Sequence, residues 1–310
     1  MSGLSFRRRV GLVAVGALLL ALVLPVTTSS AAAPGGNNPI CDSSGANCWW
    51  RVKANLTTFA APPVGVQGWF TIERPTIHDL QNQHSLAAMF IGEYAGNDIT
   101  NGIEMGWAVA PSVYGGDTRP HLFAFSVRQA HQDPTCWTKP TNCGWHENPG
   151  ARYKIGDVGT ALQNQHGVER SFFILRNTDG RWLVEYEGDT LGWYDSAYWD
   201  GSGGFHPNEV SWYGEVQHTA AGLLDLTGAR GGPGCTEMGN GNFGHSQDAA
   251  TVGGLGYWTQ DASGFHNNWA HPVRSENGGS NLDWYDMGDQ LNQSWFTYGG
   301  SGGREGQAAC

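Results

Sequence analysis

The amino-acid sequence predicts an all-β protein, built as an antiparallel sandwich or barrel. The chain of 310 residues contains 46 glycines and 14 tryptophans, while charged residues make up only 15%. Short runs of β-branched and aromatic residues recur between Gly, Asn, Asp and Pro, and long amphipathic helical patterns are hard to find. These observations favour many short strands joined by turns over a helical fold.

Nine runs along the chain have the composition of β-strands. Two of them form a predicted hairpin, because Asp179-Gly180 between them supplies the residues that a tight turn requires. In chain order the nine runs are Val64–Ile72, Leu86–Ile91, Gly102–Val109, Leu122–Arg128, Ser171–Leu175, Trp182–Glu187, Leu191–Tyr194, Val210–Gln217 and Gly254–Thr259.

The first 33 residues have the features of an export signal. Three arginines, Arg7 to Arg9, precede the apolar run Val10–Val26, and a small-residue stretch follows that ends in Ala31-Ala32-Ala33. This order is typical of a cleaved signal peptide. A membrane anchor is the alternative, but the apolar run is short for a span of about 20 residues. We therefore expect residues 1–33 to be a signal peptide, and the mature protein to be secreted, extracellular and not attached to a membrane.

The rest of the chain predicts one domain, since no repeat of fixed period and no long linker divides it. We expect residues 34–63 to form an N-terminal lead-in that contains a Cys41–Cys48 loop, and residues 64–310 to form the β domain. Within this domain, residues 261–310 are polar, so we expect a loop-rich part that wraps the domain or adds a hairpin. We expect a monomer.

The charge of the mature chain is strongly negative. Removing the three arginines of the predicted signal leaves 14 basic against 28 acidic residues, a net charge of −14. Such a charge does not suit nucleic acid or an anionic membrane surface as a partner. It fits an extracellular protein that works in acid, where many carboxylates are protonated, although an acidic balance also aids solubility.

Six cysteines remain after the predicted cleavage, an even number that suits disulfides in an oxidising compartment. Fifteen pairings are possible in principle. Metal binding is the competing interpretation, but the chain contains no C-x-x-C and no ordered Cys/His spacing, so we expect neither a metal nor another cofactor. The spacing favours Cys41–Cys48 and Cys136–Cys143, which each close a short loop. Cys235 and Cys310 would then pair and tie the C-terminus to the domain.

Glu104 is the first candidate for chemistry. In a strand alternate side chains share a face, so the apolar residues between Ile103 and Val109 define a core face and Glu104 points the other way. It shares its face with Gly106 and Ala108, whose small side chains leave open space that would suit a substrate groove. Taken alone, however, the pattern fits a solvent-exposed glutamate better than a catalytic one.

Glu215 is the second candidate, in the predicted strand Val210–Gln217. Its apolar residues again share one face, and Tyr213 and Glu215 lie on the other. The same exposed-glutamate interpretation applies here. Glu185 and Glu187 also alternate out of a strand, so position on a strand cannot by itself identify a catalytic pair.

A set of motifs between Gly65 and about Trp258 distinguishes these glutamates from the rest. In this order the motifs resemble those of the neprosin domain, a family of secreted glutamic peptidases, and Cys136 and Cys143 fall where that family has a small disulfide loop. The motifs are His84–Ile91 (HSLAAMFI), Ile103–Trp107 (IEMGW), Val109–Asp117 (VAPSVYGGD), Arg119–Phe123 (RPHLF), Trp212–Val216 (WYGEV) and Met238–Phe243 (MGNGNF).

The resemblance implies a fold, a substrate and a catalytic pair. The fold is a β-sandwich of two stacked antiparallel sheets with a substrate groove, and the activity is hydrolysis of peptides or proteins next to proline. The catalytic glutamates of the family correspond to Glu104 and Glu215. Tyr213 stands where the family has glycine, so it is a candidate for lining the substrate pocket. Plant members have a long propeptide, but here only about 30 residues separate the predicted cleavage site from the matching region.

Two neighbouring carboxyls suffice for peptide hydrolysis in acid. They cannot both ionise at low cost, so one keeps a proton while the other stays charged. We expect Glu215 to take a proton from water and Glu104 to donate one towards the carbonyl oxygen, with the pair sharing a proton. Activity should then be lost as that proton leaves at higher pH.

Two other functions remain open on the sequence. A carbohydrate-active β-sandwich would also be secreted and rich in tryptophan, and it too would use paired glutamates. A binding module without catalysis is the third interpretation. The usual motif of zinc proteases (H-E-x-x-H) is absent from the chain.

Overall fold

The structure is a computed structural model in which strands account for most of the described chain. All of the described residues belong to one compact unit, Gly35–Cys310. None of the helices among them is long and apolar enough to cross a bilayer. The predicted signal peptide, residues 1–33, lies outside the described residues, which are 40–41, 47–96, 98–128, 136–138, 143–157, 167–219, 236–274, 285–288 and 294–302.

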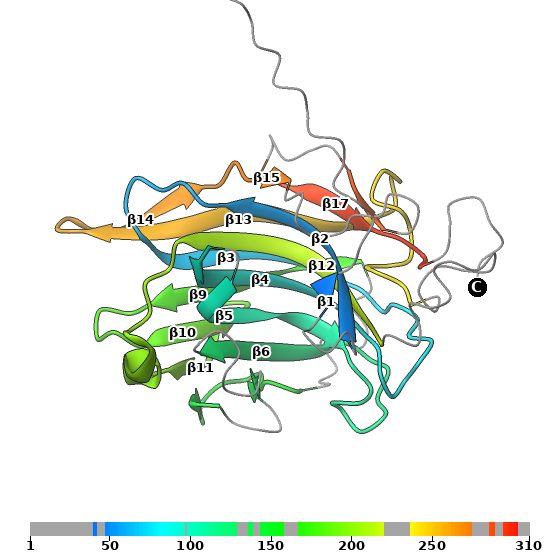
Figure 1. Cartoon of the computed structure of the whole chain (residues 1–310), viewed down its shortest axis with the longest axis horizontal. Helices are drawn as coiled ribbons and strands as arrows, with labels where there is room; N and C mark the ends of the chain where they lie inside the picture. The colour runs from blue at the N-terminus through cyan, green and yellow to red at the C-terminus, as the bar shows by residue number, and fades with distance from the viewer. Residues whose placement is uncertain are drawn as a thin grey trace, which may run out of the picture. The chain divides into compact units, whose positions relative to one another are not determined.

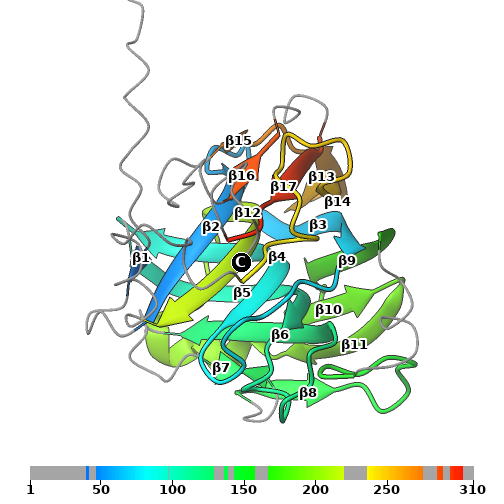
Figure 2. The same cartoon turned by 90° about the vertical axis from the view of Figure 1, so that its right-hand side faces the viewer.

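The strands form two antiparallel sheets, which we call sheet A and sheet B. The two views in Figures 1 and 2 show them as two layers, and a 3₁₀ helix, η1 (Ser196–Ser202), follows one strand of sheet B. Sheet A has the order β1 (Ile40–Cys41), β2 (Asn47–Leu56), β12 (Glu209–Thr219), β4 (His84–Ala95), β5 (Asp98–Val109), β6 (His121–Arg128) and β7 (Cys136–Trp137), with β15 (Val273–Arg274) paired to β2. Sheet B has the order β16 (Asp286–Met287), β17 (Phe296–Gly299), β13 (Ala250–Asp261), β3 (Pro63–Ile72), β9 (Val168–Arg176), β10 (Trp182–Tyr186), β11 (Asp189–Tyr194) and β8 (Trp145–Glu147), with β14 (Gly264–Trp269) paired to β13. The predicted sandwich of two stacked antiparallel sheets is therefore confirmed.

The main core fills the space between the two sheets. Each long strand contributes every second side chain to it, as expected from the alternation of a pleated strand. On β5 these are the residues from Ile103 to Val109 that the sequence assigned to the core face, and on β12 they are Val210, Trp212 and Val216. The face of sheet A turned away from this core, which we call the site face, carries the other half of each strand.

Two tryptophans of sheet A tie the layers together by hydrogen bonds. The Trp107 indole donates to the carbonyl oxygen of Thr71 at 2.9 Å, and the Trp212 indole donates to that of Gln67 at 2.7 Å. Both acceptors belong to β3 in sheet B. Since a buried indole N–H must find a partner, these bonds fix how β5 and β12 lie over β3.

Each of the nine predicted strands is present, with ends shifted by a few residues. The predicted hairpin joins β9 to β10, where Trp182 pairs with Arg176 and Gly180 takes the positive φ of 89° that the turn requires. At the C-terminal end, β13 and β14 form a further hairpin, one of the two arrangements expected for this polar part of the chain.

Strand β2 corrects the expectation that residues 34–63 are a lead-in to the β domain. It runs for ten residues and pairs with β12 along its whole length, from Leu56 opposite Val210 to Asn47 opposite Thr219. Its buried residues alternate strictly, with Cys48, Trp50, Val52 and Ala54 all at most 1% exposed. The sandwich thus begins within the predicted lead-in, and β2 lies inside sheet A.

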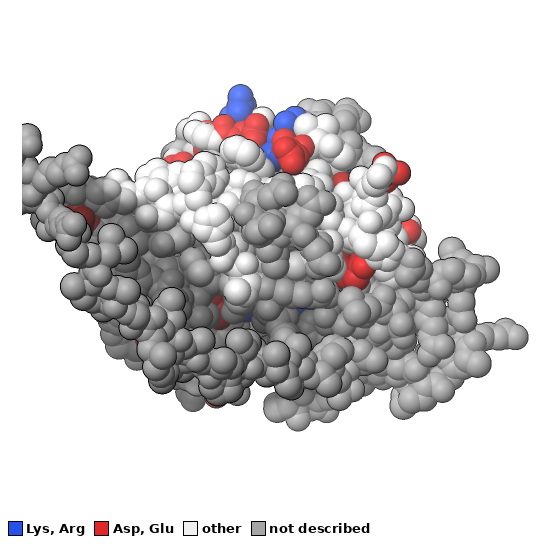
Figure 3. Space-filling view, turned by 90° about the horizontal axis from the view of Figure 1, so that it is seen from above, with Lys and Arg blue, Asp and Glu red and all other residues white. Residues whose placement is uncertain are grey.

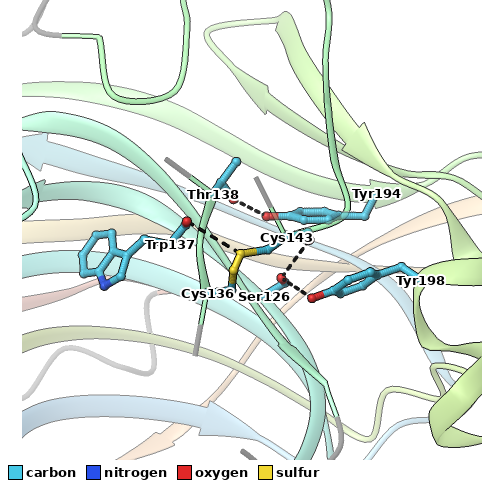
Figure 4. Close-up of a disulfide and its surroundings, with 7 residues drawn as sticks. All are labelled: Ser126, Cys136, Trp137, Thr138, Cys143, Tyr194 and Tyr198. Atoms are coloured by element: carbon cyan, nitrogen blue, oxygen red, sulfur yellow. Dashed lines mark hydrogen bonds between the residues drawn. A yellow bond between two sulfur atoms is a disulfide. The ribbon is translucent and has the colours of Figure 1, made fainter. Parts of the chain in front are cut away.

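The disulfide predictions can be compared with the structure at two of the three pairs. Cys136 and Cys143 are bonded as predicted, in the loop shown in Figure 4. Cys48 also takes part in a disulfide, and the β1–β2 register places Cys41 directly opposite it. The predicted Cys235–Cys310 pair lies outside the described residues.

Replacing Trp107 by phenylalanine tests the link between the sheets. The change removes the donor to Thr71 and leaves a buried carbonyl without it, so the free energy of unfolding should fall by about 1–3 kcal/mol. Trp69→Phe is the matched control, because Trp69 lies on sheet B and is 40% exposed, and it should change stability by less than about 0.5 kcal/mol. Urea unfolding of the two variants measures both values, and equal losses would contradict the role given to the Trp107 bond.

Candidate active site

Glu104 and Glu215 both lie on the site face of sheet A. Glu104 is on β5 and Glu215 on β12, and β4 runs between these two strands. Glu215 is 4% exposed and Glu104 is 9% exposed. The interpretation of either residue as a solvent-exposed strand glutamate is therefore wrong: both carboxyls are removed from water, although they face away from the main core.

Strand register sets the position of each glutamate on this face. Glu215 lies opposite Arg51 of β2 on one side and Leu86 of β4 on the other. Glu104 lies opposite Phe90 of β4. The row of residues between these two contains Tyr213, which precedes Glu215 by two positions along β12. Tyr213 is thus placed between the two carboxyls, on the face that the sequence predicted.

Two basic side chains hold the Glu215 carboxylate. Arg51 forms a salt bridge with its Oε2 through Nε, and His84 Nε2 lies 3.1 Å from its Oε1. Burial by itself would raise the pKa of Glu215, but the Arg51 guanidinium and the hydrogen bond and charge of His84 outweigh it. The pKa of Glu215 is therefore below its ordinary value, so this carboxyl stays ionised in moderate acid.

Glu104 has the opposite balance. Burial raises its pKa most, and the negative charge of Glu215 raises it further. Arg51, the Tyr213 hydroxyl and Lys53 act in the other direction but do not compensate. With its pKa well above the ordinary value, Glu104 keeps its proton at a pH where Glu215 is ionised, and the pair is divided into one acid and one carboxylate.

Tyr213 connects the two glutamates. Its hydroxyl forms a hydrogen bond with Glu104, while the Arg51 guanidinium lies 5.2 Å from the centre of its ring. The same arginine binds Glu215. Burial raises the pKa of the Tyr213 hydroxyl well above its ordinary value, so the hydroxyl remains a hydrogen-bond donor. Its contribution to binding a substrate, predicted from the sequence, stays a prediction.

A second buried ion pair lies beside the first. Lys53 Nζ is 2.5 Å from Glu209 Oε1 and 3.4 Å from the Tyr94 hydroxyl. Burial lowers the pKa of Lys53 more than the Glu209 charge raises it. Because Lys53 follows Arg51 by two positions on β2, both cations point to the site face and act on the pair.

The sequence analysis missed Arg51, Lys53 and His84 as site residues. The signal was available for the first two, since apolar and polar residues alternate through Asn47–Leu56 in the manner of a half-buried strand. His84 lies in one of the motifs of the family resemblance, but nothing in the sequence alone showed that it would contact Glu215.

Apolar side chains surround the charged groups of the site face. Gly106 fits between them because the Cβ of any other residue would overlap the carbonyl oxygen of Ala87. A low-polarity surface of this kind strengthens the electrostatic interactions of the pair. The buried members are Leu86, Ala88, Phe90, Ala108, Ala110, Phe123 and Tyr213, and Tyr94, Ile99, Val113, Tyr114, Phe125 and Trp137 lie against them partly buried.

Other features of the described surface lie apart from the glutamate pair. Figure 3 shows acidic side chains spread over the described part of one face, with some basic side chains beside acidic ones at its upper edge. A hollow of about 430 Å³ opens on sheet B and contains Trp69, Glu169 and Trp269 but none of the predicted site residues. Within the ranges that the structure describes, no group of three or more His, Cys, Asp or Glu could hold a metal ion.

Comparisons with known proteins identify a family. Residues 81–301, which contain both glutamates, match the family model described as Neprosin. A search of curated proteins found no match. Among solved structures, the chain is similar to Scytalido-glutamic peptidase with a peptide-based transition-state analog, with 7% identity, a TM-score of 0.40 and coverage of 81% of this chain and 98% of that chain. It is also similar to the κ-carrageenase from Pseudoalteromonas carrageenovora in complex with an oligotetrasaccharide of κ-carrageenan, with 8% identity, a TM-score of 0.28 and coverage of 84% and 81%. At these TM-scores neither likeness decides the function of this chain.

Replacing Glu104 by glutamine tests the division of the pair through stability. Because the pKa of Glu104 is raised on folding, its contribution to stability is present below the unfolded pKa and is lost as the pH rises through the folded pKa. Because glutamine does not ionise, the Glu104→Gln variant does not lose this stability as the pH rises. The variant should therefore gain free energy of unfolding relative to the wild type at neutral and alkaline pH, and the gain should shrink in acid.

Urea unfolding at a series of pH values measures this difference. Glu185→Gln is the matched control, since Glu185 is a partly exposed strand glutamate on β10 of sheet B, and its difference from the wild type should not grow with pH. A Glu104→Gln curve that stays parallel to the wild type would show that the Glu104 carboxyl is not held protonated.

Proposed function

We propose, because the chain belongs to the neprosin family, that it is a secreted endopeptidase that hydrolyses peptide bonds next to proline and uses Glu104 and Glu215 to activate water in acid. Membership of this family supports a glutamic peptidase. The observation that carries the proposal is the division of two buried carboxyls on one sheet face. One of them is bound by Arg51 and His84, and the other is left beside that negative charge.

The proposed reaction assigns opposite tasks to the two groups. Glu215, ionised, takes a proton from water as the water oxygen bonds to the carbonyl carbon, and Glu104 gives its proton to the carbonyl oxygen. When the carbon–nitrogen bond breaks, Glu215 passes its proton to the leaving nitrogen and Glu104 takes back the proton from the oxygen. Each carboxyl thus ends in its starting state, and no cofactor enters the balance.

The surroundings of the pair suit an apolar residue of the substrate. Phe125 and Trp137 lie on the same face as the glutamates, in the row of Glu104, and both are partly exposed. A proline ring is apolar and rigid and has no N–H to satisfy, so such a surface accepts it without a buried unpaired donor. The resemblance to the family supplies the proline specificity itself.

Export is the second part of the proposal. The disulfide between Cys136 and Cys143 is a feature of proteins that fold in an oxidising compartment. It supports the signal peptide proposed for residues 1–33. We propose accordingly that the mature enzyme works outside the cell as a monomer on proline-containing peptides or proteins.

Glutamine variants of the two glutamates test the proposal directly. A proline-rich peptide is incubated with the purified mature protein from acid to neutral pH, and the fragments are identified by mass spectrometry. We expect cleavage next to proline in acid, and a loss of at least about 100-fold in rate for both Glu104→Gln and Glu215→Gln, because each removes one partner of the proton transfer. Glu185→Gln should retain the wild-type rate.

The other outcomes separate the alternatives. Cleavage that survives in Glu104→Gln or Glu215→Gln would refute the assignment of the pair. A peptide that stays intact at every pH would refute the peptidase, and turnover of a polysaccharide by the same protein would then support the carbohydrate-active interpretation.

An Arg51→Gln variant tests how Glu215 is kept ionised. Without the guanidinium the pKa of Glu215 should rise, so the acid limb of the pH profile of kcat/KM should move to higher pH and the loss of rate should be largest at the acid end. Arg181→Gln is the control, because Arg181 pairs with Asp179 at an exposed turn of sheet B. An Arg51→Gln profile lowered equally at all pH values would contradict this role.

A further inference from the structure

Trp137 is an aromatic side chain at the edge of the site face. It belongs to β7 and lies opposite Phe125 of β6, which in turn lies opposite Glu104 of β5. The three residues form one row across sheet A. Strand register therefore brings Trp137 to the site face, in the same row across the sheet as Glu104.

The contacts of its ring place Trp137 near the other glutamate as well. The His84 ring lies 5.7 Å from the Trp137 ring at an interplanar angle of 83°, and His84 Nε2 lies 3.1 Å from Glu215 Oε1. The rings of Phe123 and Phe125 lie 5.2 and 6.1 Å from the Trp137 ring. The indole thus lies in the row of Glu104 and against the histidine that contacts Glu215.

The backbone that carries Trp137 is anchored on both sides. The Cys136–Cys143 disulfide closes the loop, and the Cys143 sulfur lies 3.8 Å from the Trp137 carbonyl oxygen. On the other side, Thr138 Oγ1 is 2.5 Å from the Tyr194 hydroxyl of sheet B. Figure 4 shows the Trp137 ring pointing away from these anchors. A ring fixed in this way loses little freedom when it receives a ligand.

Exposure separates Trp137 from the other aromatic candidate. Tyr213 is only 3% exposed and its hydroxyl is engaged with Glu104. Trp137 keeps an intermediate exposure in spite of its ring contacts. Trp137 therefore offers exposed apolar surface to a ligand, whereas Tyr213 does not.

We propose that Trp137 is the specificity-determining residue that receives the proline ring of the substrate beside the scissile bond, an assignment that rests on the proposed peptidase function. The juxtaposition that carries it is an indole beside a disulfide, in the row of Glu104 and against the ring of His84, which contacts Glu215, and this indole is partly open to solvent. Proline suits an aromatic wall because its ring is rigid and apolar, and aromatic surfaces are the usual recognition elements for proline-rich segments.

Selectivity between matched peptides tests the proposal. Two peptides differ only in proline or alanine beside the cleaved bond, and kcat and KM are measured for each with the wild type, Trp137→Leu and Trp137→Phe. We expect the wild type to prefer proline and Trp137→Leu to lower the Pro/Ala ratio of kcat/KM by about 10-fold or more. The pH profile should not move, because the glutamates keep their partners. Trp137→Phe, which retains an aromatic face, should keep most of the ratio.

Each further outcome decides between this inference and the function on which it rests. Trp137→Leu with an unchanged Pro/Ala ratio, or Trp137→Phe losing the ratio as fully as Trp137→Leu, overturns the role of Trp137 and leaves the peptidase intact. A wild type that cleaves neither peptide overturns both. Trp69→Leu on sheet B is the control and should leave the ratio unchanged.

Binding supplies a readout that does not depend on turnover. In the Glu104→Gln background, affinity for the proline peptide over the alanine peptide is compared with and without Trp137→Leu. If Trp137→Leu abolishes the difference in affinity between the proline and alanine peptides, the assignment is supported. If that difference in affinity keeps its size, the assignment is overturned.

Discussion

The salt bridge between Arg51 and Glu215 is the interaction on which the site depends. It joins neighbouring strands on the site face of sheet A, where the Glu215 side chain is 5% exposed, so leaving this carboxylate unpaired would be strongly unfavourable. Its presence keeps Glu215 ionised, and the resulting negative charge is one of the causes that keep Glu104 protonated. The ion pair, together with His84 and with the burial of Glu104, therefore shifts the pKa values of the two glutamates in opposite directions.

The sandwich supplies the conditions for this ion pair through strand register. From β2 to β6 the pairing is unbroken across the rows that contain the glutamates, and the shift in the β4–β5 pairing comes only at Glu93, beyond the site. A slip of one residue would exchange the two faces and turn Glu104 or Glu215 into the core. The indole bonds of Trp107 and Trp212 to β3 oppose such a slip, because a shifted strand would leave both donors buried without acceptors.

Alternation along single strands explains how far the sequence could predict this arrangement. It assigned Ile103 and Met105 to the core and Glu104 to the opposite face, and it did the same around Glu215, because period two is a local property of the chain. Burial of that opposite face is not local: it depends on residues from β2, β4 and β7 that meet only in the folded sheet. For this reason each glutamate looked exposed by itself, and the family resemblance was needed to pair them.

Strand β2 and Trp137 mark the limits of the sequence analysis for different physical reasons. The alternation of β2 is regular, but the strand lies in a stretch that was assigned to a lead-in, so Arg51 was not considered as a partner of Glu215. Trp137 belongs to a strand of two residues, too short for any periodicity, and its position follows from the disulfide and from the contact of Thr138 with Tyr194. A site built on long strands can therefore be read in part from alternation, while the side chains that close over it are placed by contacts between distant segments of the chain.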